Sequence, residues 1–240
     1  MGQYYTPVLT QNGITRLYCG RKVYTIINGK RVMSDYQGAK IMEHSWYGNW
    51  LMLGIAKKIY NKKGRIAWVG DYTDDIMEQV KSNDGTVAPL APSELYSGCY
   101  YKRNEDGTLY HNEQGYIEED TTRPLPKNVK VSKIGYDETF DLNGKFFINL
   151  TKKEYIDLDV YFKRSVDDDG WCICPISLMT STGGDQGGGD YHSDMIDQFY
   201  VGQWAYDEVV IKDKAPKGKD YTVLNVTFNE NMQVPCQGVA

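Results

Sequence analysis

Polar residues alternate with apolar ones along much of this chain, which is the pattern of strands with one buried face. Near the N-terminus the pattern covers residues 4–9, 15–20 and 22–27, and Asn28-Gly29 is a typical hairpin turn. Strand-like runs return after residue 145, at 146–150, 155–162, 172–179, 198–206, 208–213 and 221–228. Because strands of this kind commonly pair with sequence neighbours, the chain is expected to form a sheet.

Helical spacing is confined to a few segments. Apolar and basic residues recur at helical intervals over residues 50–60, and the following Asn-Lys-Lys-Gly sequence supplies a stop. Residues 74–85 are compatible with one or two further helical turns, whereas the short apolar run at 65–72 predicts a buried strand. The expected fold class is therefore α+β, with a mostly antiparallel or mixed sheet and few helices.

Chain length favours one domain, because 240 residues lie near the upper end of what a single hydrophobic core supports. We expect a single domain over residues 1–240. The segment from about 87 to 131 is poorer in apolar residues and richer in turn formers, so it is interpreted as a loop and hairpin insertion. The 20 Tyr against 6 Phe favour half-buried strands or a contact surface of amphipathic rings.

The cysteines predict a reducing compartment. There are five of them, an odd number, and no Cys-x-x-Cys pair, which fits reduced thiols better than a disulfide framework or a zinc site. Cys172 and Cys174 alternate along a predicted strand and are interpreted as packing residues. No stretch approaches the roughly 18 uninterrupted apolar residues of a membrane span, and the start of the chain lacks a secretion signal. We therefore expect a cytoplasmic protein without membrane contact.

Charge is distributed unevenly along the chain. Residues 1–70 hold 11 Lys or Arg and 2 acidic residues, whereas residues 71–240 hold 16 bases and 30 acids. Such asymmetry can indicate an anionic partner for the basic end. It can also indicate a basic region resting on an acidic one within a single fold, with Lys57 and Lys58 placed to suit a helix dipole. Nucleic acid is an unlikely partner, because the net charge is −5 and no nucleic-acid-binding motif is present.

The segment 180–194 concentrates five glycines, three carboxylates and His192, one of three histidines. Glycines allow backbone N–H groups to converge on an anion, and Asp and His supply metal ligands or general acids and bases. A divalent metal is a possible cofactor here. The candidate ligand-binding residues of this segment are Ser181, Gly187, Gly188, Gly189, Asp190 and His192. A connecting surface loop made of turn formers remains an alternative.

A second cluster surrounds a repeated Gly-Asp-Tyr sequence, which occurs at 70–72 and again at 189–191. Asp71 follows a predicted buried strand, a common position for functional residues, although it could equally cap a helix at 74–85. The candidate residues of this cluster are His44, Trp46, Asp71 and Tyr72. No Walker loop, G-x-S-x-G elbow or H-E-x-x-H motif is present, so no catalytic residue is assigned.

Several islands of the chain resemble a set of uncharacterised bacterial and phage or mobile-element proteins. These are MGQYYTPVL, IMEHSWYGN, IAWVGDY, GGGDY and VGQWAYDEVVI, in this order. The resemblance covers about half of the chain. It implies a prokaryotic or phage cytosolic setting and no particular activity or catalytic residue.

Two functional hypotheses follow. The first is a non-catalytic binding protein, such as an inhibitor or a phage or mobile-element factor that captures a host protein or a small anionic ligand. The alternative is a metal-assisted phosphoester hydrolase with Asp190, His192 and Asp71 in one cleft. The absence of a complete catalytic set favours the first.

Overall fold

The structure is a computed structural model. The structure describes residues 4–18, 24–27, 30–33, 45–70, 92–106, 108, 110–116, 118–134, 140–182 and 201–226. The predicted helical turns at 74–85 lie outside this part of the chain.

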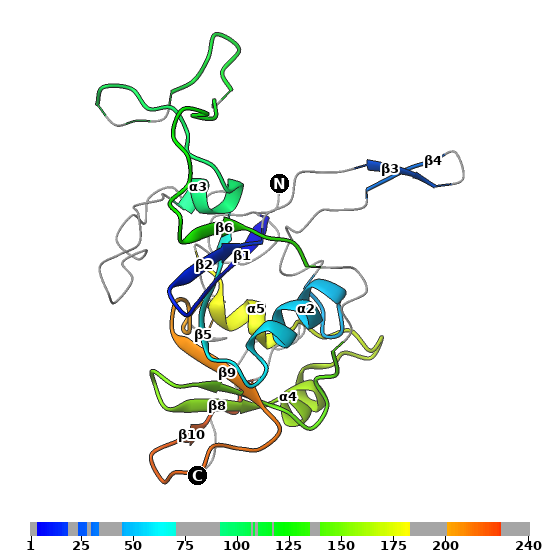
Figure 1. Cartoon of the computed structure of the whole chain (residues 1–240). Coiled ribbons are helices and arrows are strands. Elements are labelled where there is room, and N and C mark those ends of the chain that lie inside the picture. The colour runs from blue at the N-terminus through cyan, green and yellow to red at the C-terminus, as the bar shows by residue number, and fades with distance from the viewer. Residues whose placement is uncertain are drawn as a thin grey trace.

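One sheet of eight strands dominates the described residues (Figure 1). Its order is β10-β8-β7-β9-β5-β1-β2-β6. The strands are β1 (Tyr5–Gln11), β2 (Ile14–Leu17), β5 (Gly64–Gly70), β6 (Val129–Val131), β7 (Phe146–Asn149), β8 (Glu154–Asp157), β9 (Glu208–Lys212) and β10 (Thr222–Val223). A separate antiparallel hairpin joins β3 (Tyr24–Ile27) to β4 (Lys30–Met33).

The sheet is mixed. All its internal pairs are antiparallel, whereas the two edge strands, β6 beside β2 and β10 beside β8, are parallel to their neighbours. The expected α+β class with few helices is confirmed.

Helices cover both faces of the sheet. They are α2 (Trp50–Ile59), α3 (Pro92–Ser97), α4 (Leu158–Ser165) and α5 (Pro175–Thr180). Helices α2, α4 and α5 contribute to a large core cluster on one face, and α3 contributes Leu95 to a smaller cluster on the other. Strand β5 lies between the two: Ile66 and Trp68 belong to the large cluster, and Ala67 and Val69 to the small one.

Two predicted strands are partly helices, for identifiable physical reasons. Run 172–179 becomes α5 because Pro175 occupies the first helical position, where its fixed φ suits a helix and its missing N–H is not needed. All side chains of α5 are buried, and periodicity cannot distinguish such a helix from a buried strand. Run 155–162 changes from β8 to α4 at Asp157, whose carboxylate accepts hydrogen bonds from the backbone N–H groups of Asp159 and Val160.

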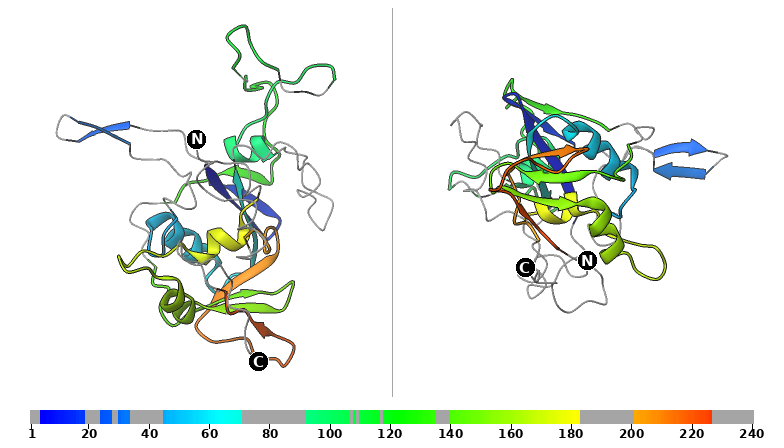
Figure 2. Two further views of the ribbon diagram at one scale, coloured as in Figure 1. Left: turned by 180° about the vertical axis from the view of Figure 1, so that it is seen from behind. Right: turned by 90° about the horizontal axis from the view of Figure 1, so that it is seen from below.

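Other strand predictions shorten. The described part of 198–206 forms turns rather than a strand, and in the described part of run 221–228 the strand is limited to the two residues of β10. The segment interpreted as an insertion contains α3 and ends in β6, which returns to the main sheet. Between them, residues 100–120 project away from the sheet, as does the β3–β4 hairpin (Figures 1 and 2).

Cys99, Cys172 and Cys174 are free thiols. Cys172 and Cys174 are buried in the large core cluster, which confirms that they are packing residues. Burial raises the pKa of the Cys174 thiol to about 12, so it is neutral at physiological pH. Across the described parts of the chain, no helix is long and apolar enough to cross a membrane.

Gly54, in the middle of α2, provides a test of this packing. A Cβ atom added at Gly54 would lie 2.2 Å from the Ile134 Cγ2 atom. Alanine gains about 1 kcal/mol of helix propensity over glycine, but overpacking a core costs about 1–3 kcal/mol. We expect Gly54→Ala to lower the free energy of unfolding in urea, and to raise it when Ile134→Ala is also present. A stabilising effect in the parent background would contradict the described packing of α2.

Candidate anion-binding site

A hollow of about 590 Å³ opens where β2, the end of α2 and the segment after β6 meet. It is built from elements that are far apart in the sequence. Its lining residues are Gln11, Asn12, Ile14, Arg16, Tyr18, Lys57, Lys58, Lys62, Ser132 and Lys133.

Strand β2 supplies the floor of the hollow. Successive side chains of a strand point to opposite faces, so Ile14, Arg16 and Tyr18 share one face. Leu17, on the other face, belongs to the small core cluster with α3. Arg16 therefore lies on the side of the sheet that α2 covers.

Helix α2 supplies the first wall. The Asn49 carboxamide oxygen accepts a hydrogen bond of 2.8 Å from the Leu51 N–H, which starts the helix. At its other end the Gln11 side-chain amide donates to the carbonyl oxygen of Lys58, at 3.0 Å. This bond ties the end of α2 to strand β1, so the lysines of its last turn, Lys57 and Lys58, border β2.

The segment after β6 supplies the opposite wall. Strand β6 runs parallel to β2, with Arg16 beside Lys130 in register. The Ser132 N–H then donates to the Leu17 carbonyl oxygen at 2.9 Å, which keeps the chain beside β2 and brings Lys133 to the hollow.

The hollow is positively charged. Among the described residues that line it, five are Arg or Lys and none is Asp or Glu. Within the described chain no carboxylate forms an ion pair with Arg16, Lys57 or Lys62, whereas nearby Lys63 pairs with Glu208 at 3.3 Å. Because like charges repel, this arrangement favours a bound anion.

The structure bears on the two explanations of the charge asymmetry. The negative end of the α2 dipole accounts for cations at Lys57 and Lys58. It does not account for Arg16 and Lys133, which come from other elements and face the same hollow. Convergence of cations from three elements is the arrangement expected of an anion site.

Of the residues singled out in the sequence, the structure describes Ser181 and Trp46. Ser181 is buried, and its hydroxyl donates to the Leu178 carbonyl oxygen at 3.3 Å, so it caps the end of α5. Trp46 is 38% exposed and forms an isolated bridge with Ile173. The others lie outside the described residues: His44, Asp71, Tyr72, Gly187, Gly188, Gly189, Asp190 and His192.

The described flanks of the two Gly-Asp-Tyr segments lie side by side. Thr182, just before the glycine-rich segment, donates to the Trp68 carbonyl oxygen from its N–H at 2.8 Å and from its hydroxyl at 3.1 Å. Trp68 itself lies two residues before Gly70, where the described part of β5 ends. Ser45, the neighbour of His44, instead accepts a hydrogen bond from Cys174 at the other end of α5, about 9 Å away by helix geometry.

Within the parts of the chain that are described, no three His, Cys, Asp or Glu side chains are grouped to hold a metal ion. The structure also reveals site residues that the sequence interpretation did not select, above all Arg16 and Lys133. Neither residue lies in a local sequence motif. They come together only through the pairing of β2 with β6.

Comparison with known proteins finds no match, whether among protein families, curated proteins or solved structures. The function must therefore be argued from the geometry of this chain.

Gly202 provides a test of how the ends of the glycine-rich segment are joined. Its φ is +72°, and a Cβ atom there would lie 2.6 Å from the Ser181 carbonyl oxygen. Gly144 is a matched control, because its φ is +65° but no atom lies within 4 Å of its added Cβ. We expect Gly144→Ala to destabilise by about 1–2 kcal/mol, the cost of a left-handed residue, and Gly202→Ala to cost clearly more. Equal unfolding free energies in urea for the two variants would contradict the close approach at Ser181.

Proposed function

We propose that this chain is a non-catalytic binding protein for a small polar anion that carries several negative charges. The observation that carries the proposal is the hollow itself, whose described lining holds five basic side chains and no carboxylate. Its volume of about 590 Å³ lies within the range of small-molecule sites.

The lining favours a ligand with phosphate-like groups. Arg16 presents a planar fork of donors, which suits a phosphate oxygen pair, and the lysines act as point charges around it. Ser132 and Asn12 add neutral polar groups to the lining. This mixture supports a hydrophilic polyanion rather than an apolar acid.

Binding without catalysis is supported by what lines the hollow. Its described lining includes neither His, Cys, Asp nor Glu, so no general base of these types stands beside the Ser132 hydroxyl to activate it. A cytosolic setting belongs to the same proposal, and the free thiols of Cys99, Cys172 and Cys174 support it.

Charge reversal in the hollow tests the proposal. Lys57→Glu combined with Lys62→Glu removes two positive charges from the lining and adds two negative ones. We expect binding of inorganic tripolyphosphate, measured by calorimetry at low ionic strength, to weaken at least about tenfold. Both side chains are exposed, so the variant is expected to fold.

The matched control is Lys163→Glu combined with Lys219→Glu. Lys163 lies in the last turn of α4 as Lys57 does in α2, so both changes disturb a helix dipole, and Lys219 is exposed. We expect the control to retain the parent affinity for tripolyphosphate. An equal loss of tripolyphosphate affinity in both variants would show an effect of net charge alone and would refute a site at this hollow. A parent protein without affinity for tripolyphosphate would refute it as well.

Nucleic acid binding makes a different prediction. The cations converge on one hollow, whereas a nucleic acid needs a basic stripe that follows its backbone. We expect labelled DNA and RNA oligonucleotides to bind with a Kd above about 100 µM at physiological salt, by fluorescence anisotropy. A tight complex that weakens steeply with salt and is lost in Lys57→Glu/Lys62→Glu would assign the hollow to nucleic acid instead.

A further inference from the structure

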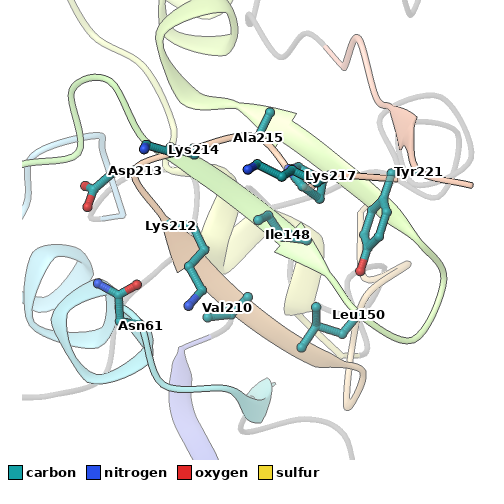
Figure 3. A pocket seen from close by; sticks show the side chains of 11 residues that line it. Asn61, Ile148, Leu150, Val210, Lys212, Asp213, Lys214, Ala215, Lys217 and Tyr221 are labelled. Atoms are coloured by element: carbon teal, nitrogen blue, oxygen red, sulfur yellow. The ribbon is translucent and has the colours of Figure 1, made fainter. Parts of the chain in front are cut away.

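A second hollow lies on the other half of the sheet, over β7 and β9 (Figure 3). Phe147, Val209 and Ile211 point into the large core cluster. The alternate residues of the same strands point the other way, and Ile148 and Val210 are directly paired across the two strands. An apolar floor therefore forms on the face opposite helices α2, α4 and α5.

The chain after β9 folds over this floor. Residues 213–221 leave the sheet and return at β10, where the Thr222 N–H donates to the Lys153 carbonyl oxygen at 2.9 Å. Between this segment and the strands lies a hollow of about 420 Å³. Apart from Ile148 and Val210, its apolar lining comes from Leu150, Ala215, Pro216 and Tyr221.

Charged residues lie around the apolar floor. Lys212, Lys214 and Lys217 line the hollow together with one acid, Asp213. The Asp213 carboxylate accepts hydrogen bonds from the Tyr60 hydroxyl at 2.5 Å and from the Lys145 ammonium at 3.0 Å. Both hydrogen bonds lower the pKa of Asp213, and the bond from Tyr60 has the larger effect. The Asp213 carboxylate therefore stays ionised and is already bound by these two side chains.

The three lysines that line the hollow are available to a bound anion. Within the described chain, none of Lys212, Lys214 and Lys217 forms an ion pair with a carboxylate. Figure 3 shows Leu150 and Tyr221 at one end of the hollow, and Asp213 with Lys214 at the other. The hollow is therefore amphipathic: Leu150 and Tyr221 make one end apolar, and Lys212, Lys214 and Lys217 lie along its length.

We propose that this second hollow binds a small aromatic acid, a ligand with a flat apolar body and one anionic group. The apolar body would pack against the partly exposed Leu150 and Tyr221, above the buried floor of Ile148 and Val210, and the anion would face the lysines. Apolar contact stabilises such a ligand, and its charged group orients it toward the lysines. The basic hollow at Arg16 differs, since its lining is polar almost throughout.

The probe for this site is 2-naphthoate, with the uncharged 2-naphthamide as its isosteric comparison. We expect calorimetry to show that the parent binds naphthoate at least about fivefold more tightly than naphthamide, because only the acid meets the lysines. Lys217→Glu places a carboxylate at the hollow and is expected to weaken naphthoate binding by at least about fivefold. Leu150→Asp changes the apolar end and is expected to weaken both probes.

Lys219→Glu is the matched control. Lys219 is exposed and lies two residues from Lys217 in the same segment, but it does not line the hollow. We expect it to retain naphthoate affinity within about twofold, as Lys57→Glu should at the distant basic hollow. Backbone amide shifts of residues 210–217 on addition of naphthoate would locate the ligand independently of any variant.

Several outcomes would overturn the proposal. Absence of naphthoate binding by the parent, equal binding of the acid and the amide, or equal losses for Lys217→Glu and Lys219→Glu would each exclude an aromatic acid here. Amide shifts confined to other parts of the sheet would do the same. None of these outcomes bears on tripolyphosphate binding, so the two sites are tested separately.

Discussion

Strand β5 is enclosed on both faces, and the positions of the other elements depend on it. Ile66, Ala67, Trp68 and Val69 are all 0% exposed, which requires a covering layer on each side of the sheet. Helices α2 and α5 help to cover Ile66 and Trp68, and α3 helps to cover Ala67 and Val69. Burying a large apolar side chain contributes about 1.5–3 kcal/mol, so each of Ile66, Trp68 and Val69 favours the covering layers by about that amount. Strand β1 pairs with β5 from Arg65 to Gly70, and on the other side β9 pairs only with Gly64 and Arg65. Beyond β9, the N–H groups of Tyr206 and Thr182 donate to the carbonyl oxygens of Ile66 and Trp68.

Both ends of β5 also organise the surface. At its start, Gly64 packs against the side chain of Gln11, whose amide holds the end of α2 beside β1. The lysines of α2 are thereby fixed near Arg16. At its far end, the Trp68 carbonyl receives both hydrogen bonds of Thr182, which joins the chain that leaves α5 to the chain that leaves the sheet. The basic hollow and the contact between the described flanks of the two Gly-Asp-Tyr segments therefore both depend on the buried strand β5.

The two hollows differ because they use the sheet differently. At the β2 edge the floor includes the charged residue Arg16, and cations from α2 and from the segment after β6 surround it. Over β7 and β9 the floor is apolar, and the lysines lie around it, while Asp213 is held by Tyr60 and Lys145. The first therefore favours a hydrophilic polyanion and the second an amphipathic acid, although both are cationic. Because the Asp213 carboxylate already binds Tyr60 and Lys145, the nearby lysines are available to a bound anion.

The sequence alone determined the α+β class with few helices, the helix that became α2, the buried strand that became β5 and the unequal charge, because these features depend on composition and on short-range periodicity. It left open whether the sheet is mostly antiparallel or mixed. It could not show that Pro175 begins a buried helix, since a segment with every side chain buried has no periodic pattern to distinguish it. The candidate residues chosen from the sequence clustered in glycine-rich and aromatic motifs, where chemistry is visible locally. Arg16 and Lys133 had no such motif. Only the parallel pairing of β2 with β6 and the docking of α2 through Gln11 decided that they share a hollow, because proximity between distant residues is set by tertiary packing rather than by neighbouring sequence.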